Sequence, residues 1–343
     1  MTKVTKSVLF LLLKVGLIAA AYGYIAWQLT SMHNLHQVLQ GVGDRLFSTK
    51  AILTFLVVLL LMFLNWGIEA KKWSLLMTPY KAITFKESYR AVLAGLTVSV
   101  FTPNRIGEFF GRVLSLSFSN PVFAMLSTIA GSIAQLMVTI VLGLPAALYI
   151  YLLHMPISQM PIESIIIAVS FVPLILLILL FQYLPAIFRW LATLVPSRFR
   201  IVKYYLRAFT PHTQKHLNLV LLYSFLRYGV FTAQYVLLLC FFGVSEYYLD
   251  LFIPVAAVFF IMMAIPSVAL AELGVRSSVA LSVFSVWFGL SSKLTDEVTM
   301  GIMVSASVLW IINIAIPALI GSFYVGQFNF TDFFGKIIGK WKS

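Results

Sequence analysis

The chain has 343 residues, of which 61% are hydrophobic and only 10% are charged. A soluble globular protein carries charge on about a quarter of its residues, so this composition excludes an ordinary water-soluble domain. The net charge of +13 would favour nucleic acid if the basic residues formed one solvated face, but they fall in short segments between apolar runs. We therefore expect a membrane protein with anionic lipid headgroups as partners and no nucleic-acid partner.

Apolar stretches long enough to cross a bilayer recur along the chain. A helix needs about 20 apolar residues to span a hydrocarbon core of roughly 30 Å, and six stretches qualify. They lie near Val8–Leu29, Ala51–Trp66, Val122–Leu152, Ile165–Leu184, Leu217–Phe242 and Val298–Val325. Pro145, Pro173 and Pro317 lie inside spans, where we expect kinks rather than helix ends.

The basic residues predict the orientation, because Lys and Arg accumulate in cytoplasmic segments. The groups placed on that side contain Lys3, Lys6, Lys71, Lys72, Lys81, Lys86, Arg90, Arg189, Arg198, Arg200, Lys203, Arg207, Lys215, Lys336, Lys340 and Lys342. The opposite side receives Arg45, Lys50 and Lys293. Both termini are therefore expected in the cytoplasm.

Two features concern the membrane surface. Five tryptophans fall near predicted span ends, as residues of an interfacial aromatic belt would: Trp27, Trp66, Trp73, Trp190 and Trp341. The longest cytoplasmic connection, Pro185–His216, mixes basic and aromatic residues. This mixture favours an amphipathic helix on the inner leaflet, with a solvated basic loop as the alternative.

Two further apolar stretches are interrupted in the middle. The first runs from about Ser88 to Ser119 and is broken at Thr102-Pro103-Asn104-Arg105-Ile106-Gly107-Glu108. The second runs from about Asp250 to Leu290 and is broken near Ile265-Pro266-Ser267. The charge map requires each stretch to return to the side that it entered. We therefore expect two re-entrant helical hairpins, the first entering from the cytoplasm and the second from outside.

The two breaks resemble each other, since each proline is followed by a glutamate and then by an arginine four residues later. Each half of the chain then contains two spans, a hairpin and a third span, in opposite orientations. We predict one all-α polytopic membrane domain over residues 1–343, with six full transmembrane helices plus two re-entrant helical hairpins related as an inverted-topology repeat. The repeats cover residues 1–152 and 165–326, and a cytoplasmic tail covers 327–343.

Ionisable side chains at membrane depth mark the candidate site, because each costs roughly 2.5–3.5 kcal/mol on insertion. An inverted repeat places a substrate site at the midplane between broken helices. We expect the substrate-binding residues there, with polar neighbours from the turns and the fifth span: Asn104, Arg105, Glu108, Arg112, Arg227, Gln234, Glu272 and Arg276.

The Glu–Arg pairs of the two hairpins have two interpretations. Glu and Arg four residues apart share a helix face, so Glu108–Arg112 and Glu272–Arg276 could be internal salt bridges that make broken helices tolerable. The functional interpretation adds the unpaired N–H groups at the start of each second half-helix, which together with a guanidinium suit a phosphate or other anion. Arg227 either faces the same cavity, as a partner of the headgroup, Glu108 or Glu272, or extends to the cytoplasmic edge.

Motifs for other chemistry do not occur in the sequence. There is no phosphate-binding glycine loop, no metal-spaced Cys/His set and no nucleophile motif. His33 and His36 lack a convincing third ligand. We therefore expect neither an enzyme nor a cofactor.

The motifs together resemble the lysylphosphatidylglycerol synthase transmembrane-region family, the flippase-like domain. The resemblance rests on Thr102–Glu108 with Gly111-Arg112, on Ser224-Phe225-Leu226-Arg227-Tyr228 with Gln234, and on Glu272-Leu273-Gly274-Val275-Arg276. It implies a bacterial inner-membrane protein that moves a lipid or lipid-linked headgroup between leaflets. Larger relatives carry a soluble synthase, which we expect to be missing here because the chain ends at Ser343. That absence puts lysyl-phosphatidylglycerol itself in doubt as the substrate.

The leading hypothesis is a lipid flippase-like transporter with a midplane site between the two hairpins, where an anionic or polyprenyl-linked headgroup binds while the tails stay in lipid. The alternatives are a transporter of a small soluble anion and a membrane subunit of a polyprenyl-glycan or lipid-modifying enzyme system. A separate lipid-modifying enzyme and further copies of the chain are compatible partners.

Overall fold

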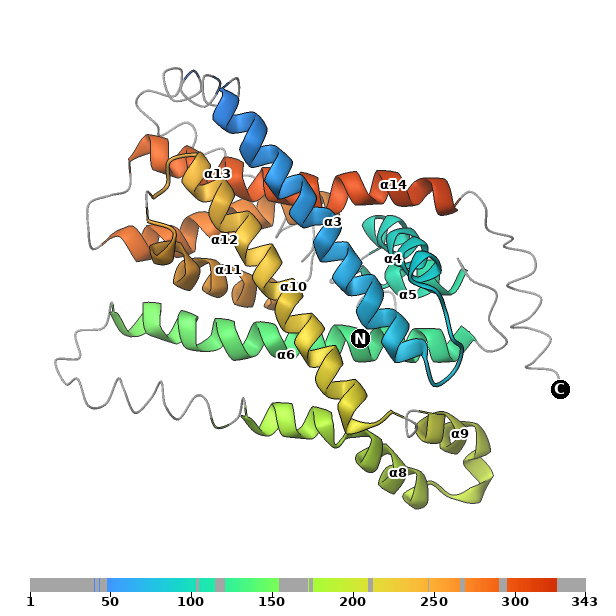
Figure 1. Cartoon of the computed structure of the whole chain (residues 1–343). Helices are drawn as coiled ribbons and strands as arrows, with labels where there is room; N and C mark the ends of the chain where they lie inside the picture. The colour runs from blue at the N-terminus through green and yellow to red at the C-terminus, as the bar shows by residue number, and fades with distance from the viewer. Residues whose placement is uncertain are drawn as a thin grey trace, which may run out of the picture. The chain divides into compact units, whose positions relative to one another are not determined.

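A computed structural model describes Gln40, Gly43 and residues 48–102, 105–114, 121–153, 172, 175–208, 212–245, 247–265, 269–289 and 295–325. All regular structure in these residues is helical (Figure 1). The elements are α3 (Thr49–Met77), α4 (Phe85–Val100), α5 (Gly107–Leu114), α6 (Pro121–Leu153), α8 (Leu184–Leu194), η2 (Ser197–Phe199), α9 (Arg200–Ala208), α10 (Gln214–Phe241), η3 (Leu249–Leu251), α11 (Phe252–Ala264), α12 (Ala269–Gly289), α13 (Asp296–Trp310), η4 (Ile311–Ala315) and α14 (Ile316–Val325).

Helices of membrane-spanning length confirm an all-α, multi-pass membrane protein. Within the described residues, four are long and apolar enough to cross a bilayer: Thr49–Met77, Val122–Leu153, Gln214–Phe241 and Asp296–Val325. A fifth candidate is the pair Ile175–Gln182 and Leu184–Leu194, which is bent by 64°. The predicted span at Val8–Leu29 lies outside the described residues. Six full spans and re-entrant geometry remain predictions.

The first of these helices presents a broad apolar face to its surroundings. Ile52 is 68% exposed and Leu60 is 59% exposed, and Leu53, Leu56 and Leu64 are also exposed. Large apolar side chains in contact with water would be unfavourable by about 25 cal/mol per Å². Contact with lipid tails removes this cost, so the face suits a bilayer.

The helix that contains this predicted span continues about three turns beyond Trp66, because α3 ends at Met77. The prediction followed hydropathy, which falls where Glu69, Lys71 and Lys72 appear in the sequence. Glu69 and Lys72 are nevertheless buried, at side-chain exposures of 6% and 1%. Their charges are paired inside the protein, so the helix does not end where the apolar run ends.

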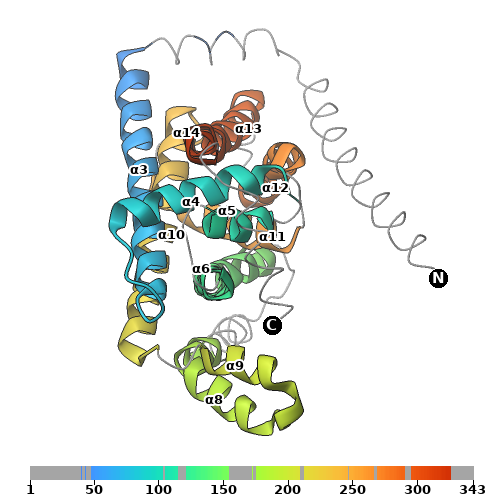
Figure 2. The same ribbon diagram turned by 90° about the vertical axis from the view of Figure 1, so that its right-hand side faces the viewer.

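Both predicted interruptions are present. The first separates α4, which ends at Val100, from α5, which begins at Gly107. The second separates α11, which ends at Ala264, from α12, which begins at Ala269. In each case the two helices pack against each other, and Figure 2 shows this for α4 and α5. Each interruption therefore forms a helical hairpin.

Prolines inside two of the long helices do not end them, as predicted. Pro145 lies within α6. Pro317 lies in the first turn of α14, directly after the π-helical turn η4. A proline has no N–H to donate and its ring clashes with the preceding turn, and a wider turn accommodates this without ending the helix. Pro173 lies outside the described residues.

The chain divides into two compact units. Unit 1 comprises residues 1–62, 146–157 and 231–315, and unit 2 comprises 63–145, 158–230 and 316–343. α3 and α10 run side by side in opposite directions (Figure 1), joined in unit 1 by a hydrogen bond of 2.8 Å from Gln234 Nε2 to the Val58 carbonyl. The unit boundaries differ from the halves proposed at 1–152 and 165–326, and the inverted repeat stays a prediction.

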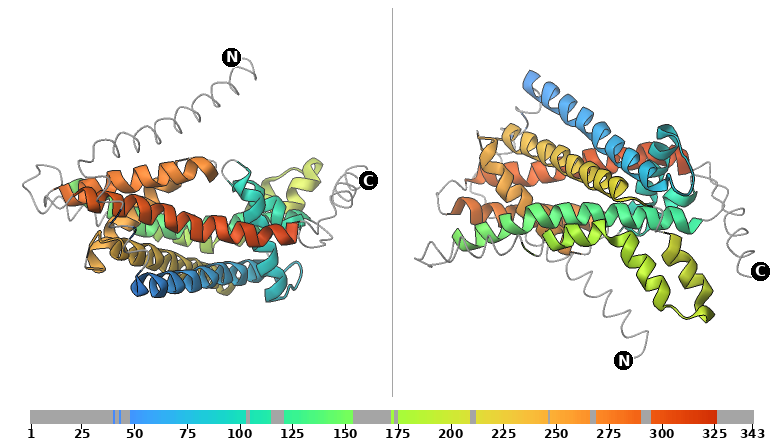
Figure 3. Two further views of the ribbon diagram at one scale, coloured as in Figure 1. Left: turned by 90° about the horizontal axis from the view of Figure 1, so that it is seen from above. Right: turned by 60° about the horizontal axis from the view of Figure 1, so that its bottom comes forward.

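The connection from Pro185 to His216 contains two short helices, α8 and α9, that lie side by side in unit 2 (Figure 3). α9 places Arg200, Lys203 and Arg207 on a helix that also exposes Val202 and Tyr204. The amphipathic helix expected from the sequence is therefore present, and its contact with the inner leaflet stays a prediction.

Candidate functional site

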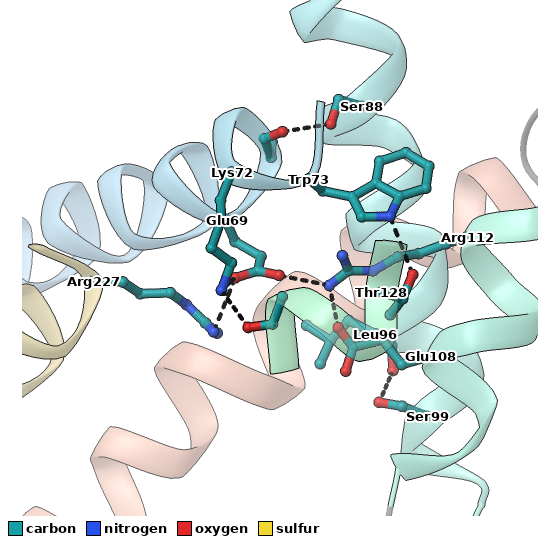
Figure 4. Close-up of polar contacts among 12 residues, drawn as sticks. Glu69, Lys72, Trp73, Ser88, Leu96, Ser99, Glu108, Arg112, Thr128 and Arg227 are labelled. Carbon is teal, nitrogen blue, oxygen red and sulfur yellow. Dashed lines mark hydrogen bonds and ion pairs between the residues drawn. The ribbon is translucent and has the colours of Figure 1, made fainter. Parts of the chain in front are cut away.

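A buried carboxylate on α3 gathers three cations around it in unit 2. Glu69 Oε2 lies 2.7 Å from Lys72 Nζ and 3.1 Å from Arg227 Nη1, while Glu69 Oε1 lies 2.9 Å from Arg112 Nη2 (Figure 4). These side chains come from α3, α5 and α10. Lys72 also donates to the Gly131 carbonyl of α6 at 3.2 Å. Glu69 therefore joins three helices through charged contacts.

Arg112 is held from several sides. Its Nη2 contacts the carboxylates of both Glu69 and Glu108. Its guanidinium lies 5.6 Å from the centre of the Trp73 ring, a distance at which a cation is attracted to the aromatic face. Trp73 is fixed in turn, because its indole N–H donates to Thr128 Oγ1 at 3.1 Å. The arginine is 1% exposed, and its position is fixed before any ligand arrives.

Arg227 points toward α3, where its side chain is 20% exposed. Its Nε donates to Asn65 Oδ1 at 3.2 Å, and its guanidinium lies 5.0 Å from the Trp66 ring centre. With the ion pair to Glu69, these contacts hold the guanidinium against α3, and a role in binding a headgroup stays a prediction. The carboxylate that it meets is Glu69, whereas the sequence had offered Glu108 or Glu272.

We call Glu69, Lys72, Glu108, Arg112 and Arg227 the unit 2 charge cluster. Its three cations and two carboxylates leave one positive charge in excess. Buried charges are costly unless paired, so the carboxylates make the cations tolerable inside the protein. The excess charge leaves the cluster able to attract an anion.

Close backbone contact between α4 and α5 positions the arginine. A Cβ on Gly111 would lie 2.5 Å from the Gly95 Cα, and one on Gly95 would lie 2.8 Å from the Arg112 Cγ. Neither position has room for a larger side chain. A Cβ on Gly107 would lie 2.4 Å from the Val98 carbonyl oxygen, so the small-residue spacing of Gly107 and Gly111 serves helix packing.

The turn between these helices is closed by local contacts. Gly107 N–H donates to Thr102 Oγ1 at 2.7 Å, and Phe109 N–H donates to the Ile106 carbonyl at 3.2 Å. The expectation of unpaired amides at the start of α5 is therefore wrong for these two groups. Arg105 adopts a φ of 56°, a region that non-glycine residues rarely enter. Asn104 lies outside the described residues.

The second Glu–Arg pair is formed in unit 1. Glu272 Oε1 lies 2.7 Å from Arg276 Nη2, and both side chains are buried. Gln234 is also buried in unit 1, where its amide nitrogen binds the Val58 carbonyl of α3. Both spacings of four residues thus form ion pairs, as expected, while a role in substrate binding stays a prediction for all of these residues.

The prediction from the sequence did not include the centre of the unit 2 charge cluster. Glu69 was not singled out, and Lys72 was counted only as a basic residue of a cytoplasmic segment, although its side chain is buried and ion-paired. Trp66 and Trp73 were assigned to an interfacial belt, yet both are buried beside the arginines. The available signal was the spacing of Trp66, Glu69 and Trp73, which places an acid on one helix with aromatic rings a turn away on either side.

Within the part of the chain that the structure describes, no group of three or more His, Cys, Asp or Glu side chains could hold a metal ion. His33 and His36 lie outside that part. The unit 2 charge cluster instead has the donors that bind carboxylate or phosphate oxygens.

Comparison with known proteins identifies the family of this chain. No curated protein and no solved structure matches it. The family model described as the lysylphosphatidylglycerol synthase TM region matches residues 11–316, which include the unit 2 charge cluster and both hairpins. The chain belongs to the lysylphosphatidylglycerol synthase TM region family.

Proposed function

We propose that this protein moves an anionic lipid, or a lipid-linked anionic headgroup, between the leaflets of a membrane. The observation that carries the proposal is the unit 2 charge cluster, in which two buried cations and a partly buried one exceed two carboxylates by one charge. Intramembrane charges that are retained despite their cost usually serve a substrate or ion. Membership of the family agrees with a lipid-related function.

The cations have separate roles in this proposal. Arg112 offers a planar guanidinium that can bind two oxygens of a phosphate at once. Its support by Glu69 and Trp73 reduces the conformational freedom lost when a headgroup binds. Arg227, which is 20% exposed, is the more accessible cation and would meet the headgroup first. Acyl or prenyl tails would remain in the lipid, against apolar faces such as that of α3.

The setting follows from the same proposal. We place the protein in the bacterial cytoplasmic membrane with both termini in the cytoplasm, as the basic residues of the sequence predict. Membrane lipids are its partners, and a separate enzyme that makes or consumes the lipid is a further partner to test. The cluster contains charged and aromatic side chains but no assembled nucleophile and base, so we assign translocation and not catalysis.

A leaflet assay tests the function. Purified protein is reconstituted into liposomes that contain phosphatidylglycerol with a fluorescent acyl chain, and external dithionite then quenches the label in the outer leaflet. Wild type should allow quenching beyond the outer-leaflet fraction, and Arg112→Gln should reduce its rate at least tenfold. Arg200→Gln, a change at an exposed arginine of α9, is the control and should match wild type.

The outcomes separate the rival functions. Quenching by Arg112→Gln as fast as by wild type, with both proteins folded, would contradict the proposed role of the cluster. No quenching beyond protein-free liposomes, with uptake of a soluble phosphate into the same vesicles, would favour the soluble-anion transporter. Turnover of a polyprenyl-linked sugar by the purified protein would favour the enzyme system.

A further inference from the structure

The two carboxylates that hold Arg112 differ in how firmly they are held themselves. Both contact the same atom, Arg112 Nη2. Glu69 also pairs with Lys72 and Arg227 and its side chain is 6% exposed. Glu108 has Arg112 as its one ion pair among the described residues, and its side chain is 22% exposed. The first carboxylate is fixed by three cations, whereas the second depends on one.

Loss of each carboxylate would therefore have a different consequence. Without Glu69, two buried cations and the partly buried Arg227 would lose their shared partner, which is strongly unfavourable. Without its contact to Glu108, Arg112 would keep Glu69 at 2.9 Å. The remaining four groups would then carry two positive charges in excess, and one bound anion would restore the resting balance.

The surroundings of Glu108 allow its side chain to move away from Arg112. Glu108 is in the first turn of α5, next to a turn of which Arg105 and Ile106 are partly or fully exposed. Gly95 places no side chain between Glu108 and Arg112, because a Cβ there would lie 3.4 Å from the Glu108 Cγ and 2.8 Å from the Arg112 Cγ. Glu108 can therefore change its rotamer toward its exposed side.

We propose that Glu108 is a displaceable counter-ion, which an incoming monoanionic phosphate group replaces on Arg112 while Glu69 stays in place. This inference rests on the proposed function and specifies how the same site takes its substrate. Carboxylate and phosphate oxygens accept the same guanidinium hydrogen bonds, so one can substitute for the other. The exchange keeps Arg112 paired at every stage. It favours headgroups with one net negative charge, such as a phosphodiester, over zwitterionic headgroups.

Binding affinity tests the exchange directly. Phosphatidylglycerol is titrated into the full-length protein in detergent micelles, and lipid binding is measured by native mass spectrometry for wild type, Glu108→Gln and Arg112→Gln. Glu108→Gln removes the competing charge and should bind about tenfold tighter, which is equivalent to about 1.4 kcal/mol. Arg112→Gln should bind at least tenfold more weakly. Asp250→Asn, which removes an exposed carboxylate of η3 in unit 1, is the control and should leave this affinity unchanged.

Each result has a defined meaning. If wild type binds the lipid and Glu108→Gln binds equally or more weakly, the exchange is wrong while the proposed function stands. Phosphatidylethanolamine is titrated in the same way. If Glu108→Gln weakens the binding of this lipid and leaves phosphatidylglycerol binding unchanged, Glu108 is instead a ligand for an ammonium group, and the exchange is wrong. If wild type binds no anionic lipid, both proposals fail.

Two further arms complete the test. If Glu108→Gln does not fold, Glu108→Asp is used, because it keeps the charge but reaches less far toward Arg112. It should tighten binding by about half as much on a logarithmic scale, and an unchanged affinity would overturn the exchange. Inorganic phosphate is titrated in parallel to separate a lipid headgroup from a free anion. Equal tightening for inorganic phosphate would support the exchange but assign it to a soluble anion.

Discussion

Replacement of Glu69 by glutamine should destabilise the protein more than any other single loss of a carboxylate in the described residues. Glu69→Gln keeps the size of the side chain but removes the charge that pairs with Lys72, Arg227 and Arg112 at 2.7, 3.1 and 2.9 Å. The excess positive charge of the unit 2 charge cluster then rises from one to two. Removing one partner of a buried ion pair costs about 3–5 kcal/mol, which is a large part of a typical stability of about 5–15 kcal/mol.

Thermal unfolding in detergent micelles, followed by tryptophan fluorescence, measures this loss. Trp66 and Trp73 flank Glu69 on α3 and contact the cluster arginines, so their emission reports on the site. The control is Asp250→Asn, which removes a carboxylate from an exposed position in η3. Wild type and the control should unfold together, and Glu69→Gln should unfold several degrees lower.

A second substitution separates lost charge from lost packing. In Glu69→Gln combined with Lys72→Met, the cluster returns to one positive charge in excess. Residues in one ion-pair network typically couple by about 0.5–3 kcal/mol, so the double variant should be more stable than the sum of the two single losses predicts. Strict additivity, or a Glu69→Gln protein as stable as Asp250→Asn, would refute the reasoning.

Three further predictions concern other elements. Gly321→Ala should destabilise by about 1–3 kcal/mol, since its Cβ would lie 2.2 Å from the Leu93 carbonyl oxygen, whereas Gly229→Ala, with nothing within 4 Å, should be neutral or slightly stabilising in the same unfolding assay. The pKa of Glu87 is lowered from 4.5 because the backbone N–H and hydroxyl of Thr84 donate to its carboxylate at the start of α4. This stabilisation is present above pH 4.5 and is lost as the pH falls through the lower folded value, so Glu87→Ala should lower the unfolding temperature at neutral pH and converge with wild type in acid. A difference in unfolding temperature that grows in acid and disappears at neutral pH would contradict the role of Glu87 in the helix cap. Replacing both Arg200 and Lys203 of α9 with glutamine should weaken protection of this segment from protease by anionic, but not zwitterionic, liposomes.

Much of the architecture could be predicted from local sequence, because it depends on the length of apolar runs and on short residue patterns. Apolar runs of sufficient length become helices in lipid, which is why α6, α10 and the helix from Asp296 to Val325 match their predicted positions. The break before α5 could be predicted because the run Thr102–Glu108, which combines polar residues with a proline and a glycine, interrupts an apolar stretch. The pairing of Glu272 with Arg276 could be predicted because residues four apart share a helix face.

The centre of the site could not be located in this way, because it depends on contacts between segments distant in sequence. Glu69 meets Arg112 and Arg227 from other helices, and no local pattern identifies such partners. Hydropathy gave no sign that Lys72 is buried, because it scores a lysine as charged whether or not the charge is paired. A buried charge network therefore lowers a hydropathy profile in the same way as a solvated segment.

Selective translocation of an anionic headgroup is the most direct test of the account. Liposomes carrying wild type or Arg112→Gln protein receive acyl-labelled phosphatidylglycerol or acyl-labelled phosphatidylcholine, and the rate of dithionite quenching is measured for each combination. The account predicts fast quenching for wild type with phosphatidylglycerol and slow quenching in the other three combinations. Equal rates for both lipids in wild type, or an unchanged preference in folded Arg112→Gln protein, would contradict it.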